Sequence, residues 1–152
     1  MTEEPREGPE LELVVSNDYR FVENLSSKQA QELHQLFQRE WWTRGRELSA
    51  VHAMLANSEL SVGAVERSSE KLVGYARVLS DQVFKALILD VIVVEAHRGR
   101  GLGKQLMDYI VSHPKLAEVK HIELYCLPEM VPFYKKWNFT SELGALKFLR
   151  RG

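Results

Sequence analysis

Glycine and basic residues alternate in residues 98–104, directly after a strongly apolar run. The segment's glycines and fixed positive charges are Gly99, Gly101, Gly103, Arg98, Arg100 and Lys104. The preceding run, ALILDVIVV at 86–94, is typical of a buried strand, and Leu102, Leu106 and Ile110 recur at helical spacing. The first turn of a helix has unpaired N–H groups and a positive dipole end, and glycines let an anion approach the backbone. The pattern therefore predicts a pyrophosphate site, to which His97 adds charge when protonated.

Two common phosphate motifs do not fit this segment. A P-loop requires glycine where Arg98 stands and serine or threonine where Gln105 stands, which argues against a kinase. The dinucleotide fingerprint requires its third glycine at the position of Lys104, and its strand opens a βαβ unit rather than following a hairpin. A glycine-rich turn with scattered surface charge remains the alternative without a ligand.

The same residues resemble a known family. Residues 98–103, RGRGLG, match the R/Q-x-x-G-x-G/A signature of the GNAT superfamily of N-acetyltransferases, and residues 133–139, FYKKWNF, resemble its FYEKLGF segment. Trp137 and Asn138 depart from the usual Leu and Gly, although Asn also tolerates a left-handed turn. The resemblance covers about residues 11–150.

The resemblance implies a cosubstrate and a mechanism. Acetyl-CoA would lay its pyrophosphate on the glycine segment and its pantetheine along the end of the central strand, and an amine would attack the thioester directly in a ternary complex. No metal is implied. The residues expected to hold acetyl-CoA are Val91, Ile92, Val93, Arg98, Gly99, Arg100, Gly101, Leu102, Gly103 and Lys104. A backbone N–H near Val93 would polarise the carbonyl.

The catalytic candidates are one phenol and two carboxylates. Tyr134 matches the family's general acid for the thiolate, and a phenol is protonated at neutral pH; the alternative is an anchoring core aromatic. Asp90 is the single charge in the apolar run, where burial favours a base, or a structural carboxylate bonded to a neighbouring element. Glu123 is the second base candidate, although its alternation with Ile122 and Leu124 equally suits a solvent-facing residue. Water alone is a further alternative.

The acceptor candidates lie outside the two motifs. Four of them stand between two predicted helices, in a connection that in this family commonly walls the acceptor site: Trp41, Trp42, Arg44 and Arg46. Adjacent tryptophans cannot both face the core from one helix, so one is expected to be exposed or to line a cleft. Arg77 and Asp81, on a predicted hairpin, are further candidates. An acceptor that is aromatic or carries a negative group near an arginine would suit these residues.

The elements that must position these side chains follow from periodicity and turn signals. Ser26 and Gln29 form a capping box before the first helix, and Asn138 ends the last one. The expected order is strand, two helices, three strands, helix, strand, helix and strand, an α/β fold with one mixed sheet flanked by helices. The expected strands are 11–25 with a bend at 16–18, 60–64, 72–79, 86–94, 121–126 and 146–150; the helices are 27–41, 48–57, 101–113 and 128–137.

Composition bounds the rest. The 152 residues suit one domain, expected at 11–152 after a poorly ordered tail at 1–10, and no apolar run predicts a membrane span. A net charge of −1 argues against nucleic acid or an anionic membrane as partner.

The cysteine and histidine residues also limit the possible sites. The lone Cys126, expected to be a small buried residue, excludes an internal disulfide and suits a cytoplasmic location. The five histidines are expected at the surface and predict no metal site. A homodimer through an exposed last strand is expected by analogy of fold. A non-catalytic CoA-binding sensor or interaction domain is the alternative to an enzyme.

Overall fold

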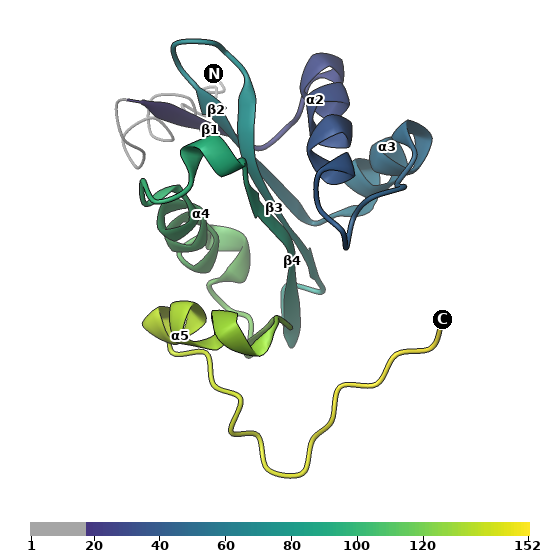
Figure 1. Cartoon of the computed structure of the whole chain (residues 1–152). Helices are drawn as coiled ribbons and strands as arrows, with labels where there is room; N and C mark the ends of the chain where they lie inside the picture. The colour runs from purple at the N-terminus through teal and green to yellow at the C-terminus, as the bar shows by residue number, and fades with distance from the viewer. Residues whose placement is uncertain (1–17) are drawn as a thin grey trace, which may run out of the picture.

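A five-stranded sheet in the order β1-β2-β3-β4-β5 forms the centre of the computed structural model, which describes residues 18–152 (Figure 1). The strands β1 to β4 are antiparallel to their neighbours, and β5 runs parallel to β4. The strands are β1 (Tyr19–Val22), β2 (Leu60–Glu66), β3 (Leu72–Ser80), β4 (Lys85–Val93) and β5 (His121–Glu123). The helices are α2 (Ser27–Gln38), α3 (Leu48–Asn57), α4 (Leu102–Val111) and α5 (Val131–Tyr134), with short 3-10 turns η1 (Glu95–His97), η2 (Pro114–Leu116), η3 (Pro128–Met130) and η4 (Lys135–Trp137). This is the predicted α/β fold.

Two apolar layers hold the helices on opposite faces of the sheet. On one face, α2 and α3 pack on the sheet through Leu33, Phe37 and Val51. On the other, α4 packs through Leu106, Met107 and Ile110, and Tyr134 of α5 belongs to the same cluster. The predicted capping box forms at the start of α2, because the Ser26 hydroxyl accepts from Gln29 N at 3.2 Å and the Gln29 side chain accepts from Ser26 N at 2.9 Å.

A bulge interrupts β4 at Asp90. Arg77 pairs with Leu89 and Tyr75 with Ile92, so three steps along β4 face two steps along β3. Asp90 takes the left-handed conformation (φ 55°), which is uncommon outside glycine and tolerated best by Asn and Asp. The bulge changes the face to which the strand's side chains point: Ile88 belongs to the core beneath α4, whereas Ile92 belongs to the core beneath α2 and α3.

β4 and β5 pair only along the first residues of β4 and separate after Leu87. Only three residue pairs join them, the last being Leu87 and Glu123. Within residues 18–152, the second half of β4 therefore has no partner strand on the β5 side. Val91 to Val93 lie on this part of the strand, and η1 connects its end to the glycine segment at 98–104.

Several predicted elements differ from the structure. The first strand, expected to reach Leu25, ends at Val22, and the last helix, expected at 128–137, is the four-residue α5 between two 3-10 turns. The first helix was expected to reach Trp41 but ends at Gln38, because the Thr43 hydroxyl donates to the Phe37 carbonyl at 2.8 Å and turns the chain away. The fifth strand ends at Glu123 rather than residue 126. Residues 1–10, and the 11–17 part of the first strand, lie outside the described residues.

The predicted last strand, with Leu146, Phe148 and Arg150, is absent. Residues 138–152 form no regular element and run away from the sheet as an extended arm (Figure 1). The three-residue β5 offers too short an edge to support a ladder with this segment. Tyr125 and Phe148 instead meet through their rings, with centroids 4.7 Å apart. No helix in the described part of the chain is long and apolar enough to span a membrane.

Candidate active site

The glycine segment forms an open turn at the start of α4. Gly99 and Gly101 have φ of 78° and 79°, and Gly101 is the N-cap of α4. A Cβ built on either glycine would meet no heavy atom within 4 Å, so the space in front of the turn is free. Backbone N–H groups at a helix start together with unobstructed space are what an anionic ligand requires. The residues therefore fit the pyrophosphate predicted from their spacing.

Arg98 fixes the position of this turn. Its Nε donates to the Val93 carbonyl at 2.9 Å, and its Nη2 donates to Glu40 Oε1 at 2.7 Å. The side chain thus ties the turn to the end of β4 and to the chain just after α2. Glu40 was missed from the sequence, because it precedes Arg98 by 58 residues and no local pattern links them.

His97 does not face the turn. Its ring is buried, and its Nδ1 lies 2.7 Å from the Tyr19 hydroxyl and its Nε2 3.5 Å from Glu66 Oε2. The expectation that the histidines are surface residues is therefore wrong for His97. The hydrogen bond to Tyr19 and the edge-to-face contact of the two rings, with centroids 5.6 Å apart, hold the His97 ring in the core.

The first turn of α4 joins the site to the segment around α5. Lys104 donates to Asp108 at 2.8 Å, and the Trp137 indole N–H donates to the other oxygen of the same carboxylate at 2.8 Å. Burial opposes the shift, but these hydrogen bonds hold the pKa of Asp108 below its usual value. Gly103 of α4 faces Phe133, and a Cβ built there would lie 3.6 Å from Phe133 Cζ, in ordinary van der Waals contact. Leu102 is buried beneath the turn, and Arg100 is exposed.

Tyr134 lies at the end of α5, in the core beneath α4. Its ring is buried between aromatic neighbours, 5.0 Å from the Phe133 ring and 6.2 Å from the Phe139 ring. Burial and the neighbouring Cys126 raise the pKa of the phenol to about 12. The phenol of Tyr134 therefore stays protonated across the ordinary pH range.

Cys126 differs from its predicted environment. It was expected to be a small buried residue, but β5 ends three residues earlier and Cys126 is exposed. Partial burial and the nearby Glu129 still raise the pKa of its thiol. The thiol is thus predominantly protonated at neutral pH.

Asp90 is bonded to two arginines. Its carboxylate accepts from Arg46 Nη1 at 2.8 Å, Arg46 Nη2 at 3.1 Å and Arg77 Nε at 2.6 Å. The Asp90 side chain is only 4% exposed. The contacts join β4, β3 and the α2–α3 connection, so the structural alternative left open by the sequence is realised in the geometry. Two predicted acceptor residues, Arg46 and Arg77, meet here.

The other candidates lie apart from this cluster. Glu123 is exposed and bonded to Lys85 at 2.7 Å across the sheet. Asp81 accepts from the backbone N–H groups of residues 83–85, and these bonds lower the pKa of its carboxyl. It shapes the β3–β4 turn. Trp41 and Trp42 are both exposed, since α2 ends before them.

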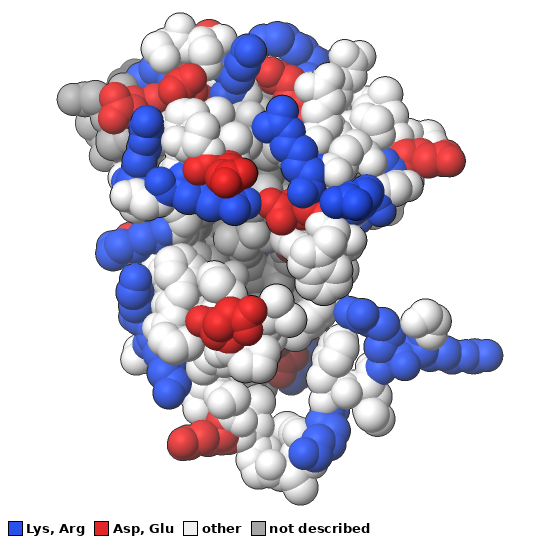
Figure 2. Space-filling model, viewed as in Figure 1, with Lys and Arg blue, Asp and Glu red and all other residues white. Residues whose placement is uncertain are grey.

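The open face of the molecule is hollowed next to these elements. Figure 2 shows a hollow between the upper part of the molecule, with α2 and α3, and the lower part, with α5, and basic and acidic side chains stand at its upper rim. A pocket of about 170 Å³ lies between α2 and the end of β4, lined by Leu36, Arg39, Glu40, Ile92, Val94, Glu95 and Arg98. Among residues 18–152, no group of three His, Cys, Asp or Glu side chains is placed to hold a metal.

The Asp90 cluster predicts a stability effect. The Asp90→Asn variant should lower the free energy of unfolding by about 2–3 kcal/mol, because it leaves two arginines without their buried counter-charge; a fully buried pair would lose about 3–5 kcal/mol, and Arg46 is partly exposed. Urea denaturation measures this loss. Glu123→Gln, at an exposed pair, should change the same quantity by less than about 1 kcal/mol. An equal loss of stability in the two variants would contradict a structural role of Asp90.

Comparisons with known proteins agree with this geometry. Residues 25–139 match the model of the acetyltransferase (GNAT) family. The uncharacterized N-acetyltransferase ycf52 from Porphyra purpurea is 32% identical over 84% of this chain and 74% of its own length. An uncharacterized ycf52-like N-acetyltransferase from Prochlorococcus marinus is 35% identical over 86% of this chain and 74% of its own length.

Solved structures show the same fold. A protein assigned to the GNAT family from Xanthomonas campestris superposes with a TM-score of 0.76 at 26% identity, covering 91% of this chain and 95% of that one. Glucosamine-6-phosphate N-acetyltransferase from Arabidopsis thaliana, at 17% identity, shares the fold with a TM-score of 0.71, over 88% of this chain and 97% of that one. The family match and the two ycf52 relatives favour an enzyme over a non-catalytic CoA-binding domain. With its glycine turn, its unpaired strand edge and these relatives, the chain belongs to the GNAT family and is an acetyl-CoA-dependent N-acetyltransferase.

Proposed function

We propose that the chain transfers an acetyl group to the primary amine of a small molecule or a protein by direct attack within a ternary complex. The observation that supports this most is the open glycine turn beside the unpaired edge of β4. Backbone N–H groups of residues 99–104 would bind the pyrophosphate, and the edge at Val91 to Val93 would pair with the pantetheine as a further strand does. The bound thioester supplies the activated acetyl group.

The chain's own groups would then polarise the carbonyl and move the protons. A backbone N–H near Val93 would donate to the carbonyl oxygen, where negative charge develops. Tyr134 would donate its proton to the departing thiolate, and its raised pKa keeps that proton available. Asp90 and Glu123 are both engaged in ion pairs, so we favour water in the open cleft over either carboxylate as the acceptor of the amine proton.

Binding and turnover together test the proposal. Calorimetric titration should show micromolar binding of acetyl-CoA, with CoA, ATP and NAD as comparisons. Release of the CoA thiol should then depend on added primary amine, and mass spectrometry should find the acetylated amine. Well-folded protein that does not bind acetyl-CoA would contradict the proposal, and the exposed Trp41 and Trp42 region would become the next site to examine.

We also propose that the chain forms a homodimer through its C-terminal arm, residues 138–152. The arm exposes Leu143, Leu146, Phe148 and Leu149, and the region after β5 exposes Tyr125, Leu127 and Met130. The arm also carries more basic than acidic residues, whereas residues 118–130 carry more acidic than basic ones. A chain that carries both the arm and the surface that the arm would contact suits a reciprocal twofold contact between two copies.

Net charge and the lone cysteine support a cytoplasmic protein without nucleic-acid or membrane partners.

The arm predicts a change of oligomeric state. Substituting Leu146 and Phe148 with Glu should convert a dimer to a monomer in sedimentation experiments, because buried charges would oppose the contact. Lys28→Glu, at an exposed residue of α2, serves as the control and should leave the dimer intact. A wild-type monomer at high concentration would overturn the dimer.

A further inference from the structure

The cluster around Asp90 carries more positive than negative charge. Two guanidinium groups, those of Arg46 and Arg77, face the single carboxylate of Asp90. The other polar pair nearby is neutral: Tyr75 and Ser61 share a hydrogen bond of 2.8 Å, and burial raises the pKa of Tyr75 to about 12. One positive charge is therefore left uncompensated within the cluster.

Arg77 retains unused donors. It contacts Asp90 through Nε, and its two terminal nitrogens donate to no protein acceptor within residues 18–152. The Arg77 side chain is only 14% exposed. Among residues 18–152, however, neither of its terminal nitrogens is both buried and without a partner, so solvent reaches these two atoms. A guanidinium with free terminal N–H groups binds a carboxylate or a phosphate in the bidentate manner.

Arg46 is held in place beside Arg77. Its guanidinium carbon lies 4.6 Å from the ring centre of Phe37, and its Nη1 lies 3.9 Å from the Met54 sulfur. These contacts, with the two bonds to Asp90, leave little freedom to the side chain, which is still 31% exposed. The charge is thus preorganised, so that a ligand loses little entropy in using it.

The cluster around Asp90 lies next to the part of β4 that we assign to the thioester. Asp90 directly precedes Val91 to Val93, on the part of β4 that has no partner on the β5 side. The bulge turns Asp90 toward Arg46, on the α2–α3 side of the sheet, and leaves Val91 and Val93 packed against the opposite core. An anion bound at the two arginines would therefore lie beside the strand that we assign to the thioester.

We infer that Arg77 and Arg46 bind an anionic group of the acceptor, so that the enzyme selects small amines that also carry a carboxylate or a phosphate monoester. This inference rests on the proposed function and narrows it. The same positive charge disfavours lysine-rich protein segments, since like charges would meet at the site. Arg77 is then a specificity-determining residue, with Asp90 fixing the direction of its side chain.

Matched acceptor pairs test the inference. The pairs are phenylalanine with phenylalaninamide and phosphoethanolamine with ethanolamine, so that the carboxylate and the phosphate are examined separately. We expect kcat/KM, measured by thiol release, to favour the anionic member of at least one pair by roughly tenfold or more, since only that member accepts charge-assisted hydrogen bonds from the guanidinium groups. Equal or better turnover of both neutral members would overturn the inference while leaving the acetyltransferase activity established.

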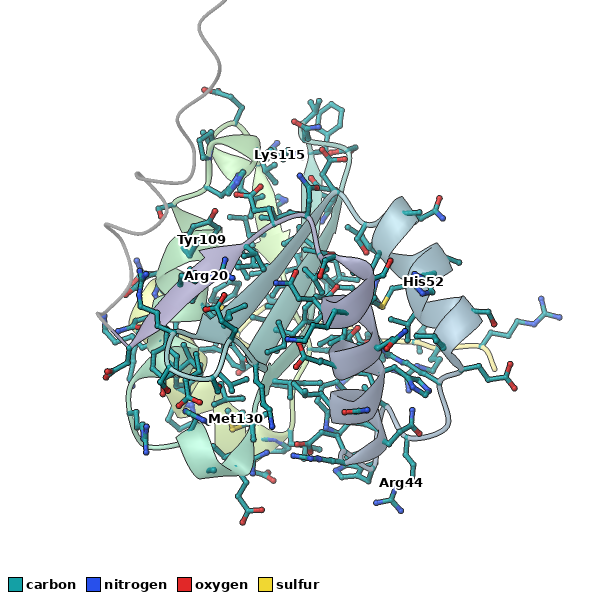
Figure 3. The ribbon with its side chains drawn as sticks, turned by 90° about the horizontal axis from the view of Figure 1, so that it is seen from above. Arg20, Arg44, His52, Tyr109, Lys115 and Met130 are labelled. Atoms are coloured by element: carbon teal, nitrogen blue, oxygen red, sulfur yellow. The ribbon has the colours of Figure 1, made fainter. Side chains whose placement is uncertain are left out.

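Two variants distinguish a specific role of Arg77 from a general effect of positive charge on acceptor choice. Arg77→Gln should bring the kcat/KM ratio within a pair close to one, because the anionic member loses its guanidinium partner, whereas Asp90 keeps its two bonds to Arg46. Arg44 is the matched control: it belongs to the same α2–α3 connection, is exposed and points outward (Figure 3). Arg44→Gln should keep the wild-type ratio. A ratio unchanged in Arg77→Gln would contradict the assignment.

Anion binding can be measured without turnover. If no amine of the four is acetylated, protein saturated with acetyl-CoA is titrated with 3-phenylpropionate, phenyl phosphate and the neutral 3-phenylpropanamide. Binding of either anion that is lost in Arg77→Gln supports the inference, and failure of both anions to bind overturns it. Failure of acetyl-CoA itself to bind would instead count against the proposed function.

Discussion

Substitution of Tyr134 with phenylalanine is expected to lower kcat by roughly 100-fold or more while leaving acetyl-CoA binding unchanged. Phenylalanine keeps the aromatic packing against Phe133 and Phe139 and removes only the proton donor. The thiolate would then leave without a positioned acid. Steady-state kinetics with saturating amine gives kcat, and calorimetry gives the affinity for acetyl-CoA.

The control for this substitution is Tyr125→Phe, at an exposed tyrosine that packs on Phe148. Its kcat should stay near the wild-type value. A wild-type kcat in Tyr134→Phe would show that Tyr134 is a core aromatic and that water protonates the thiolate.

The raised pKa of Tyr134 also sets the pH profile of the wild type. The protonated phenol is the active form, and it persists as pH rises until the pKa of about 12 is approached. An ordinary tyrosine would lose its proton near pH 10. We therefore expect kcat to rise as the acceptor amine loses its proton and then to stay level through pH 10. A descending limb centred near pH 10 would contradict the buried environment of this group.

Substitution of Gly101 with glutamate is expected to weaken acetyl-CoA binding by at least roughly 100-fold. The loss of one charge-assisted contact to a phosphate accounts for about 3 kcal/mol, which corresponds to this factor. The added carboxylate would occupy the open space in front of the turn and repel the pyrophosphate. Calorimetric titration of the variant against the wild type measures the change.

Gly144 provides a matched control for the backbone strain. Like Gly101 it has a positive φ, 67°, and no heavy atom lies within 4 Å of a Cβ built there. Gly144→Glu should bind acetyl-CoA as the wild type does. Equal losses in both variants would indicate a general effect of the substitution, and the glycine turn would then have no special place in binding.

Local patterns predicted much of the fold and part of the site correctly. The capping box at Ser26, the α2 and α4 stripes and the left-handed Asn138 depend on residues close in sequence, and the structure contains them. The prediction of a last strand was wrong because a strand needs a partner edge, and the short β5 does not offer one. The prediction that His97 lies at the surface was wrong because the sequence around it does not show that the distant Tyr19 contacts it in the core.

By itself, the sequence determined the family, the position of the glycine turn and the identity of the basic residues around it, because these depend on consecutive residues and on backbone conformations that glycine allows. Only the tertiary structure decided which charges meet. Arg46, Arg77 and Asp90 lie on three elements, and a bulge with one residue in a left-handed conformation directs Asp90 toward both arginines. Charge pairing of this kind depends on distances across the sheet, which periodicity along the chain does not specify.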